Sequence, residues 1–192
     1  VIYDNSKVLS SCRLWYMLLY FGHSKKLVKV LNGGLEKWKK NNFPITEDHT
    51  KLKMTNYKAY ENKFMVKNLD EIDKNIENKV FSLVDARSKD RFEGKTKEPR
   101  EGVRSGSIKN SICIPFNNVI KDDKTFKDKE ELKVIFNNII SDIDNNNVVF
   151  SCGSGITSCV LALAYSLINN NYNPTIYDLS LIHISEPTRQ SL

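Results

Sequence analysis

Apolar and polar residues along the chain form a pattern that predicts strands and helices in alternation. At the start of the chain the pattern predicts a strand at 1–4, a helix at about 8–22, a strand at 27–31 and a helix at about 33–41. Gly22 stands where a C-terminal stop for the first helix is expected. Alternating strands and helices predict a parallel sheet, but these elements alone cannot bury both of its faces. We therefore expect residues 1–43 to be the C-terminal half of a domain whose first half precedes Val1.

A second series of elements follows a stretch without regular periodicity, which we interpret as an interdomain linker at 44–62. The series comprises a strand near 64–66, a helix at 68–77, a strand at 80–84, a strand at 108–113, a helix at about 129–140, a strand at 148–151, a helix at 156–169 and a strand at 174–177. An irregular basic segment separates the second and third of these strands. Five strands that alternate with helices predict a doubly wound α/β domain at 63–178.

Composition and charge narrow the classes of partner. With 40% hydrophobic residues in a chain of 192, the protein is typical of globular proteins, and no apolar run is long enough to span a membrane. The net charge of +6 comes mainly from scattered lysines, so we expect no nucleic-acid partner. The four cysteines have neither the spacing of a zinc site nor that of a disulfide framework, which favours a reducing compartment. We expect no bound metal.

The sequence VVFSCGSGITSC at 148–159 is the strongest candidate for chemistry. An apolar strand leads into Cys152, and helical periodicity resumes after the turn. The turn consists of Gly153, Ser154, Gly155, Ile156 and Thr157. Two glycines let successive backbone N–H groups of the turn point inward, and the positive end of the next helix dipole lies beside them. The turn therefore favours an anion, and a thiol placed in it should be acidic. Cys152 is therefore either a thiolate nucleophile or a small buried packing residue, and the local pattern supports both equally.

Three segments of the chain together resemble a known family. FSLVDARSKDRFEGKTKEPREG (81–102), CGSGIT (152–157) and NGGLEKW (32–38) are similar, in order and spacing, to two-domain rhodanese-type sulfurtransferases, and the loop most resembles their 3-mercaptopyruvate branch. The resemblance implies tandem rhodanese-like domains, each a doubly wound parallel sheet flanked by helices. The first domain would be non-catalytic and truncated here. The resemblance also implies that Cys152 is the cysteine that forms a persulfide.

The resemblance further assigns two arginines to the substrate. Arg91 falls on the Arg-Phe pair of the family and Arg100 on its Glu-Pro-Arg, which implies that they hold the carboxylate and keto oxygen of an α-keto acid. A guanidinium offers a matched fork of donors to such a planar anion. Without the motif, each arginine would be interpreted as a surface charge on a basic segment. Arg87, which follows Asp85 and Ala86, is expected to tie the sheet edge to the active-site loop.

The loop and the resemblance together predict the donor and the acceptor. Gly153 and Ser154 are small and neutral, whereas thiosulfate-selective members carry basic side chains there, so 3-mercaptopyruvate is the expected donor. A thiol such as thioredoxin or glutathione, or cyanide, would accept the sulfur from Cys152, and no metal or organic cofactor is needed. The alternatives are a thiosulfate sulfurtransferase and a catalytically silent rhodanese-like binding module. The resemblance implies a mitochondrial or cytoplasmic protein.

Two stretches depart from the family pattern. The Gly-His-Ile-Pro-Gly-Ala stretch of the family is here Gly106 to Ser111, which lacks the His and the Pro. After Asp178 the family continues with Gly-Ser-Trp-x-Glu-Trp, but this chain reads LSLIHISEPTRQSL, which resembles the translation of a tagmentation sequencing adapter. We therefore expect residues 179–192 to be a non-native tail, and we assign no role to His183.

Overall fold

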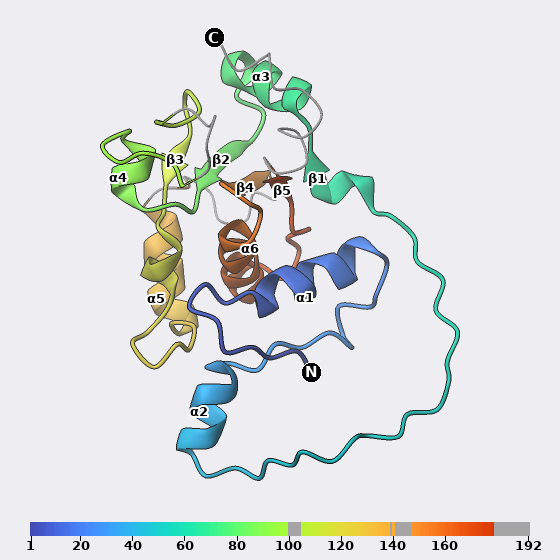
Figure 1. The fold of residues 1–192 in the computed structure, drawn as a ribbon. Coiled ribbons are helices and arrows are strands. Elements are labelled where there is room, and N and C mark those ends of the chain that lie inside the picture. Colours follow the sequence, from blue (N-terminus) through green and yellow to red (C-terminus); the bar gives the residue numbers. More distant parts are fainter. Residues whose placement is uncertain (100–104, 139, 141–146, 179–192) are drawn as a thin grey trace.

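A five-stranded sheet, parallel in every pairing, forms the centre of the molecule (Figure 1). The computed structural model describes residues 1–99, 105–138, 140 and 147–178. In spatial order the strands are β1 (Val66–Lys67), β5 (Ile176–Asp178), β4 (Val148–Cys152), β2 (Ser82–Asp85) and β3 (Ile112–Cys113). This arrangement confirms the predicted α/β class and its parallel sheet. β4 is the middle strand, so both of its edges are paired.

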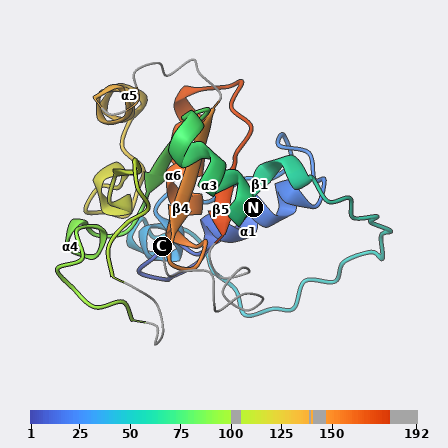
Figure 2. The ribbon, with the colours of Figure 1, turned by 90° about the horizontal axis from the view of Figure 1, so that it is seen from above.

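Helices cover both faces of the sheet (Figures 1 and 2). They are α1 (Ser11–Tyr20), α2 (Gly34–Lys40), α3 (Leu69–Asn78), α4 (Lys89–Phe92), α5 (Lys129–Asn137) and α6 (Thr157–Ile168), with 3-10 turns at Lys63–Met65 and Phe116–Val119. α3 lies on one face, while α1, α5 and α6 lie on the other. Capping boxes fix where two helices begin, with Asn68 and Glu71 at α3 and with Asp128 and Glu131 at α5.

Alternate residues of the strands enter two different cores. Leu83 and Val149 pack with Ile72 of α3 in a small core. Val84 and Phe150, the neighbours of those strand residues, belong to the larger core beside α5 and α6. Successive side chains of a strand point to opposite faces, so a strand covered on both faces is apolar on both. All of β4 is buried, which explains the apolar run in its sequence.

The N-terminal residues contribute helices but hardly any sheet. Ile2 and Val30 form one isolated parallel bridge. The predictions of extended strands at 1–4 and 27–31 are therefore wrong. A strand needs a paired neighbour along its length to satisfy its backbone groups, and among the described residues this pair meets at one position only.

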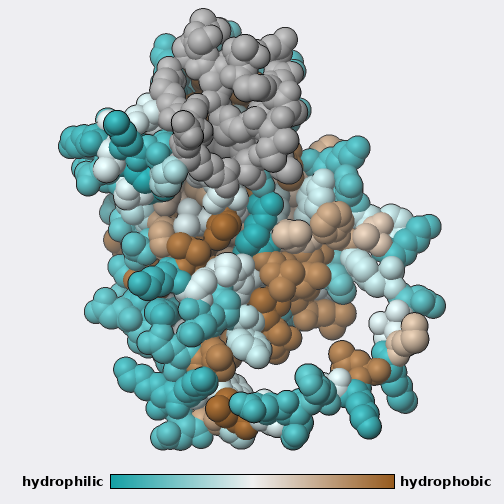
Figure 3. Space-filling view, in the orientation of Figure 1, coloured by the Kyte–Doolittle hydropathy of each residue, from teal (hydrophilic) through white to brown (hydrophobic). Residues whose placement is uncertain are grey.

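α1 connects the N-terminal residues to the helical layer of the sheet. Trp15 and Tyr16 are buried in the same core as α6. Gly22 follows the helix end with a φ of +91°, as predicted for a stop signal. The opposite side of α1 carries Leu14 and Met17, which are exposed. Figure 3 shows an apolar area over this part of the molecule.

Several element bounds in the second series also differ from the predictions. The strand predicted at 108–113 shortens to β3, because this edge strand pairs with β2 through two residues only. The strand predicted near 64–66 is a 3-10 turn followed by β1. α4, which lies within the segment interpreted as irregular, was not predicted. Residues 43–61 are exposed and contain neither helix nor strand, while the domain boundaries stay predictions. None of the described helices is long and apolar enough to cross a membrane.

Candidate active site

Cys152 is the last residue of β4, at the carboxyl end of the sheet. It is 1% exposed, and its Sγ donates to Ser158 Oγ at 3.6 Å. The thiol therefore points toward the first turn of α6. Across the sheet, Cys152 is level with Asp178 of β5. Ligands of open α/β sheets bind outside the carboxyl ends of the strands, so the thiol lies where such a fold places its chemistry.

The turn between β4 and α6 depends on Gly155. Its φ is +69°, a backbone conformation that L side chains rarely adopt. A Cβ added here would collide with the Arg13 guanidinium and would lie 2.7 Å from Asp178 Oδ2. The Gly155 carbonyl accepts hydrogen bonds from Arg13 Nη1 at 3.2 Å and from Cys159 Sγ at 3.0 Å. The turn is thus packed at Gly155 against the Arg13–Asp178 ion pair, which is 2.7 Å long.

The remaining predicted residues of the turn are more accessible than the cysteine. Gly153, Ser154, Ile156 and Thr157 are half-buried, and Thr157 is the first residue of α6. Their backbone N–H groups lie at the N-terminal end of a 12-residue helix, where the helix dipole favours negative charge. That these N–H groups favour an anion, and so would hold a persulfide on Cys152, stays a prediction.

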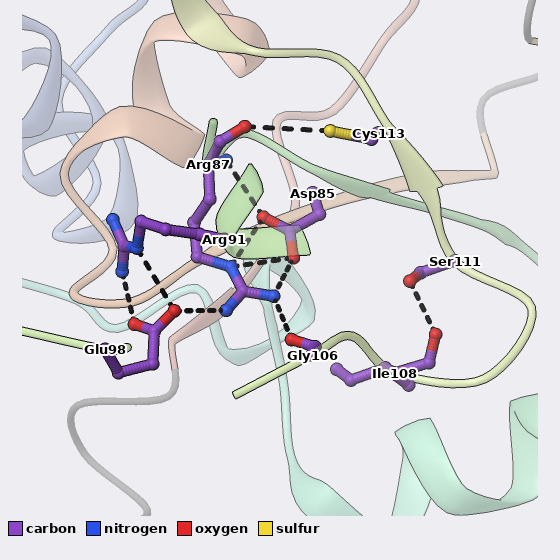
Figure 4. Close-up of polar contacts among 8 residues, drawn as sticks. All are labelled: Asp85, Arg87, Arg91, Glu98, Gly106, Ile108, Ser111 and Cys113. Atoms are coloured by element: carbon purple, nitrogen blue, oxygen red, sulfur yellow. Dashed lines mark hydrogen bonds and ion pairs between the residues drawn. The ribbon is translucent and has the colours of Figure 1, made fainter. Parts of the chain in front are cut away.

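Arg91 of α4 reaches the residue that follows the cysteine. A Cβ built on Gly153 would lie 3.0 Å from Arg91 Nη2, so the guanidinium covers this glycine directly. Glu98 holds the guanidinium there, because Arg91 Nε donates to Glu98 Oε1 at 3.1 Å and Nη2 forms an ion pair with Oε2 (Figure 4). The structure therefore brings Arg91 to the loop of Cys152. Arg100, the other predicted substrate ligand, lies outside the described residues.

Arg87 is the centre of a buried polar network (Figure 4). Its side chain is 8% exposed and forms ion pairs with Asp85 Oδ2 at 2.6 Å and with Glu98 Oε1 at 2.8 Å. Its Nη2 also donates to the Gly106 carbonyl at 2.8 Å. These contacts tie the end of β2 to the two segments beside it. Arg87 thus holds the end of β2 to Glu98 and Gly106, while a tie from the sheet edge to the active-site loop stays a prediction.

Glu98 joins the two guanidinium groups. Burial alone would raise the pKa of the Glu98 carboxyl, but the hydrogen bond and charge of Arg91, followed by those of Arg87, hold this pKa below its usual value. Asp85 and Glu98 together balance the charges of Arg87 and Arg91. In this arrangement Arg91 is neutralised, so another carboxylate can pair with it only in exchange for, or together with, Glu98.

The other cysteines have the properties of packing residues. Burial raises the pKa of Cys12 to about 12 and that of Cys113 to about 11. Burial also raises the pKa of Cys159, more strongly still. A thiol with such a pKa stays protonated at neutral pH and is a poor nucleophile. Within the described part of the chain, His, Cys, Asp and Glu side chains form no group of three that could hold a metal ion.

Sequence reasoning missed three residues of this site, namely Glu98, Arg13 and Asp178. Glu98 had a signal, because it stands two positions before Arg100 in the Glu-Pro-Arg that carried the resemblance. Arg13 had none, since its hydrogen bond to the turn joins residues that are 142 positions apart. The packing of α1 against α6 brings Arg13 and the carbonyl of Gly155 together.

Comparison with known proteins identifies the fold family of this site. The family of the rhodanese-like domain matches residues 68–181, which include β2, β4, α6 and Cys152. The chain belongs to this family.

Curated relatives of the chain are named as sulfurtransferases. It is 33% identical over 199 residues to thiosulfate/3-mercaptopyruvate sulfurtransferase 1, mitochondrial, of Arabidopsis thaliana, covering 93% of this chain and 52% of that protein. It is 35% identical over 167 residues to thiosulfate sulfurtransferase of Rattus norvegicus, covering 85% and 55%. The crystal structure of SseA from Escherichia coli, a 3-mercaptopyruvate sulfotransferase, superposes with a TM-score of 0.75 at 28% identity, covering 92% of this chain and 64% of that one. The chain thus spans about half the length of the two curated relatives.

Proposed function

We propose that this protein is a sulfurtransferase that takes sulfur from 3-mercaptopyruvate through a persulfide on Cys152. The observation that carries the proposal is the position of the thiol. It lies at the carboxyl end of the central strand and at the start of α6, and Arg91 covers the next residue of the loop. Membership of the rhodanese-like family and the names of the relatives support the same reaction class.

In the first step, the Cys152 thiolate attacks the sulfur of 3-mercaptopyruvate. A sulfur–sulfur bond forms, and the carbon–sulfur bond breaks. Its electron pair goes to the carbon and yields the enolate of pyruvate. A proton, that of the new persulfide or one from water, then converts the enolate to pyruvate. Charge and sulfur balance without an external oxidant or reductant, and no cofactor takes part.

In the second step, an acceptor thiolate attacks the outer sulfur of the persulfide, and the Cys152 thiolate leaves. The product is a persulfide on the acceptor, such as thioredoxin or glutathione, or thiocyanate when the acceptor is cyanide. Between the two steps the persulfide is an anion. N–H groups of residues 153–157 that point toward the sulfur would stabilise it, because fixed backbone dipoles need no reorganisation when the charge arrives.

The charge of the site favours a monocarboxylate donor over thiosulfate. Gly153 and Ser154 add no charge to the loop, and Glu98 already balances Arg91. A compact dianion would therefore meet a carboxylate next to its only described cationic ligand. An α-keto acid carries one charge, which Arg91 and Arg100 would bind as a planar group.

The N-terminal residues complete the proposal. Residues 1–43 would belong to a non-catalytic first rhodanese-like domain, joined by the linker at 44–62 to the catalytic one. In support of this, the similarity to SseA covers 92% of the chain and so extends beyond the match of the family at 68–181. We propose a mitochondrial or cytoplasmic location, since one relative is named as mitochondrial.

Mass spectrometry of the full chain tests the reaction directly. After incubation with 3-mercaptopyruvate, the peptide that contains Cys152 should gain one sulfur atom, and cyanide should remove it as thiocyanate. Cys152→Ser should abolish both events, while Cys113→Ser, a matched change at a half-buried cysteine, should leave them intact. Labelling by thiosulfate in preference to 3-mercaptopyruvate would indicate the thiosulfate enzyme. No labelling by either donor would indicate a silent binding module and refute the proposal.

A further inference from the structure

We propose that Arg13 is a positioning residue for the cysteine loop, and that α1 acts on sulfur transfer through it. The inference rests on the proposed function, because it concerns the loop that would hold the persulfide. α1 lies outside the match of the rhodanese-like family at 68–181. Its Arg13 nevertheless reaches the turn that follows Cys152. A side chain from the N-terminal segment thus belongs to the surroundings of the nucleophile.

An ion pair with Asp178 holds the Arg13 side chain in place. Arg13 Nη2 lies 2.7 Å from Asp178 Oδ2, and the two side chains are 25% and 2% exposed. A buried carboxylate is costly unless a cation or hydrogen bonds compensate it. Asp178 ends β5 and is level with Cys152 across the sheet. The ion pair therefore anchors the guanidinium at the strand position beside the cysteine.

Arg13 also fixes the orientation of the peptide group between Gly155 and Ile156. Arg13 Nη1 donates to the Gly155 carbonyl at 3.2 Å, and so holds this oxygen toward α1. The described residues contain no cis peptide bond, so the N–H of Ile156 points opposite to the Gly155 carbonyl. A carbonyl held toward α1 directs this N–H to the opposite side of the turn. We infer that this side faces an anion on Cys152, which backbone N–H donors would stabilise.

The Arg13 guanidinium occupies the space beside Gly155 that a side chain would need. Any Cβ at Gly155 would occupy the space that the guanidinium takes. The left-handed turn and the docking of α1 therefore depend on each other. When α1 is displaced, the carbonyl loses Arg13 as a donor, and the Cys159 thiol, a weak donor, is left to hold it. Arg13 would thus couple the N-terminal segment to the reactivity of Cys152 without touching the substrate.

Two measurements on the full chain test this coupling. In steady-state transfer from 3-mercaptopyruvate to cyanide, Arg13→Gln should lower kcat by about 10- to 100-fold and change KM little, because a misplaced reacting group affects the chemical step. Separately, the rate of Cys152 alkylation by iodoacetamide is followed against pH by peptide mass spectrometry. Its midpoint should move to higher pH in Arg13→Gln, since the thiolate loses a donor. This second readout needs no sulfur transfer, so it separates failure of this inference from failure of the proposed function.

Lys7→Gln is the matched control, because Lys7 is an exposed cation of the same segment. It should behave as the unmodified protein in both assays. If Arg13→Gln does not fold, Arg13→Lys decides the question. An ammonium can pair with Asp178 but lacks the fork that also holds the Gly155 carbonyl. Arg13→Lys should therefore retain the fold and still lower kcat. An unchanged kcat, a rise in KM alone, or an unchanged alkylation profile in the folded variant overturns the inference.

Discussion

Replacing Glu98 by Gln removes one charge from the network that holds Arg91 over the cysteine loop. The side chain of Glu98 is 3% exposed and accepts hydrogen bonds from both Arg87 and Arg91. An amide of the same shape has one acceptor oxygen and one donor group. It can satisfy one guanidinium, but it presents N–H groups to the other. The change therefore breaks at least one buried contact and leaves one guanidinium short of an acceptor.

The size of the effect follows from the partners that remain. Removing one member of a buried ion pair costs about 3–5 kcal/mol, because the other charge stays buried and unpaired. Here Arg87 keeps its ion pair with Asp85, and Arg91 is 28% exposed, so water compensates part of the loss. We therefore expect Glu98→Gln to lower the free energy of unfolding by about 2–3 kcal/mol. For a chain of this size, that corresponds to a fall in Tm of roughly 4–12 °C.

Thermal and urea unfolding at neutral pH provide the assay. Glu93→Gln is the control, since Glu93 lies in the same segment and pairs with Lys89 and Lys95 on the surface. Exposed ion pairs contribute little, so this variant should unfold close to the unmodified protein. If Glu98→Gln were as stable as Glu93→Gln, the bridge between the two arginines would not be holding the site. The account of Arg91 as a prepositioned ligand would then be wrong.

Two further predictions concern the same network. Ionised Glu98 has a pKa below its ordinary value of 4.5, so its contribution to stability is complete above that pH and is lost as pH falls through the folded-state pKa. Urea unfolding as a function of pH should consequently show a shallower acid loss in Glu98→Gln, and parallel curves for the two proteins would contradict this. Arg91→Ala should raise KM for 3-mercaptopyruvate strongly in steady-state assays, because it removes the ligand that we propose for the substrate carboxylate. An unchanged KM would exclude Arg91 from the substrate site.

The sequence predicted the segment around Cys152 better than the N-terminal segment. β4 and α6 are long, apolar and separated by a glycine turn, and their bounds lie within one residue of the prediction. The strands at 1–4 and 27–31 had a similar apolar pattern, yet they meet only in the bridge between Ile2 and Val30. Periodicity reports which side chains are to be buried. It does not report whether a neighbouring strand is present to pair with the backbone.

The sequence by itself determined the class of this protein, because short-range patterns encode it. Strand and helix alternation defined the parallel sheet, and the motifs around Cys152 and Arg91 defined the family. The tertiary structure decided how these residues are held. Arg13 meets the carbonyl of Gly155, which lies 142 positions away along the chain, because α1 packs against α6. Such contacts depend on how helices dock, and no local pattern of residues contains that information.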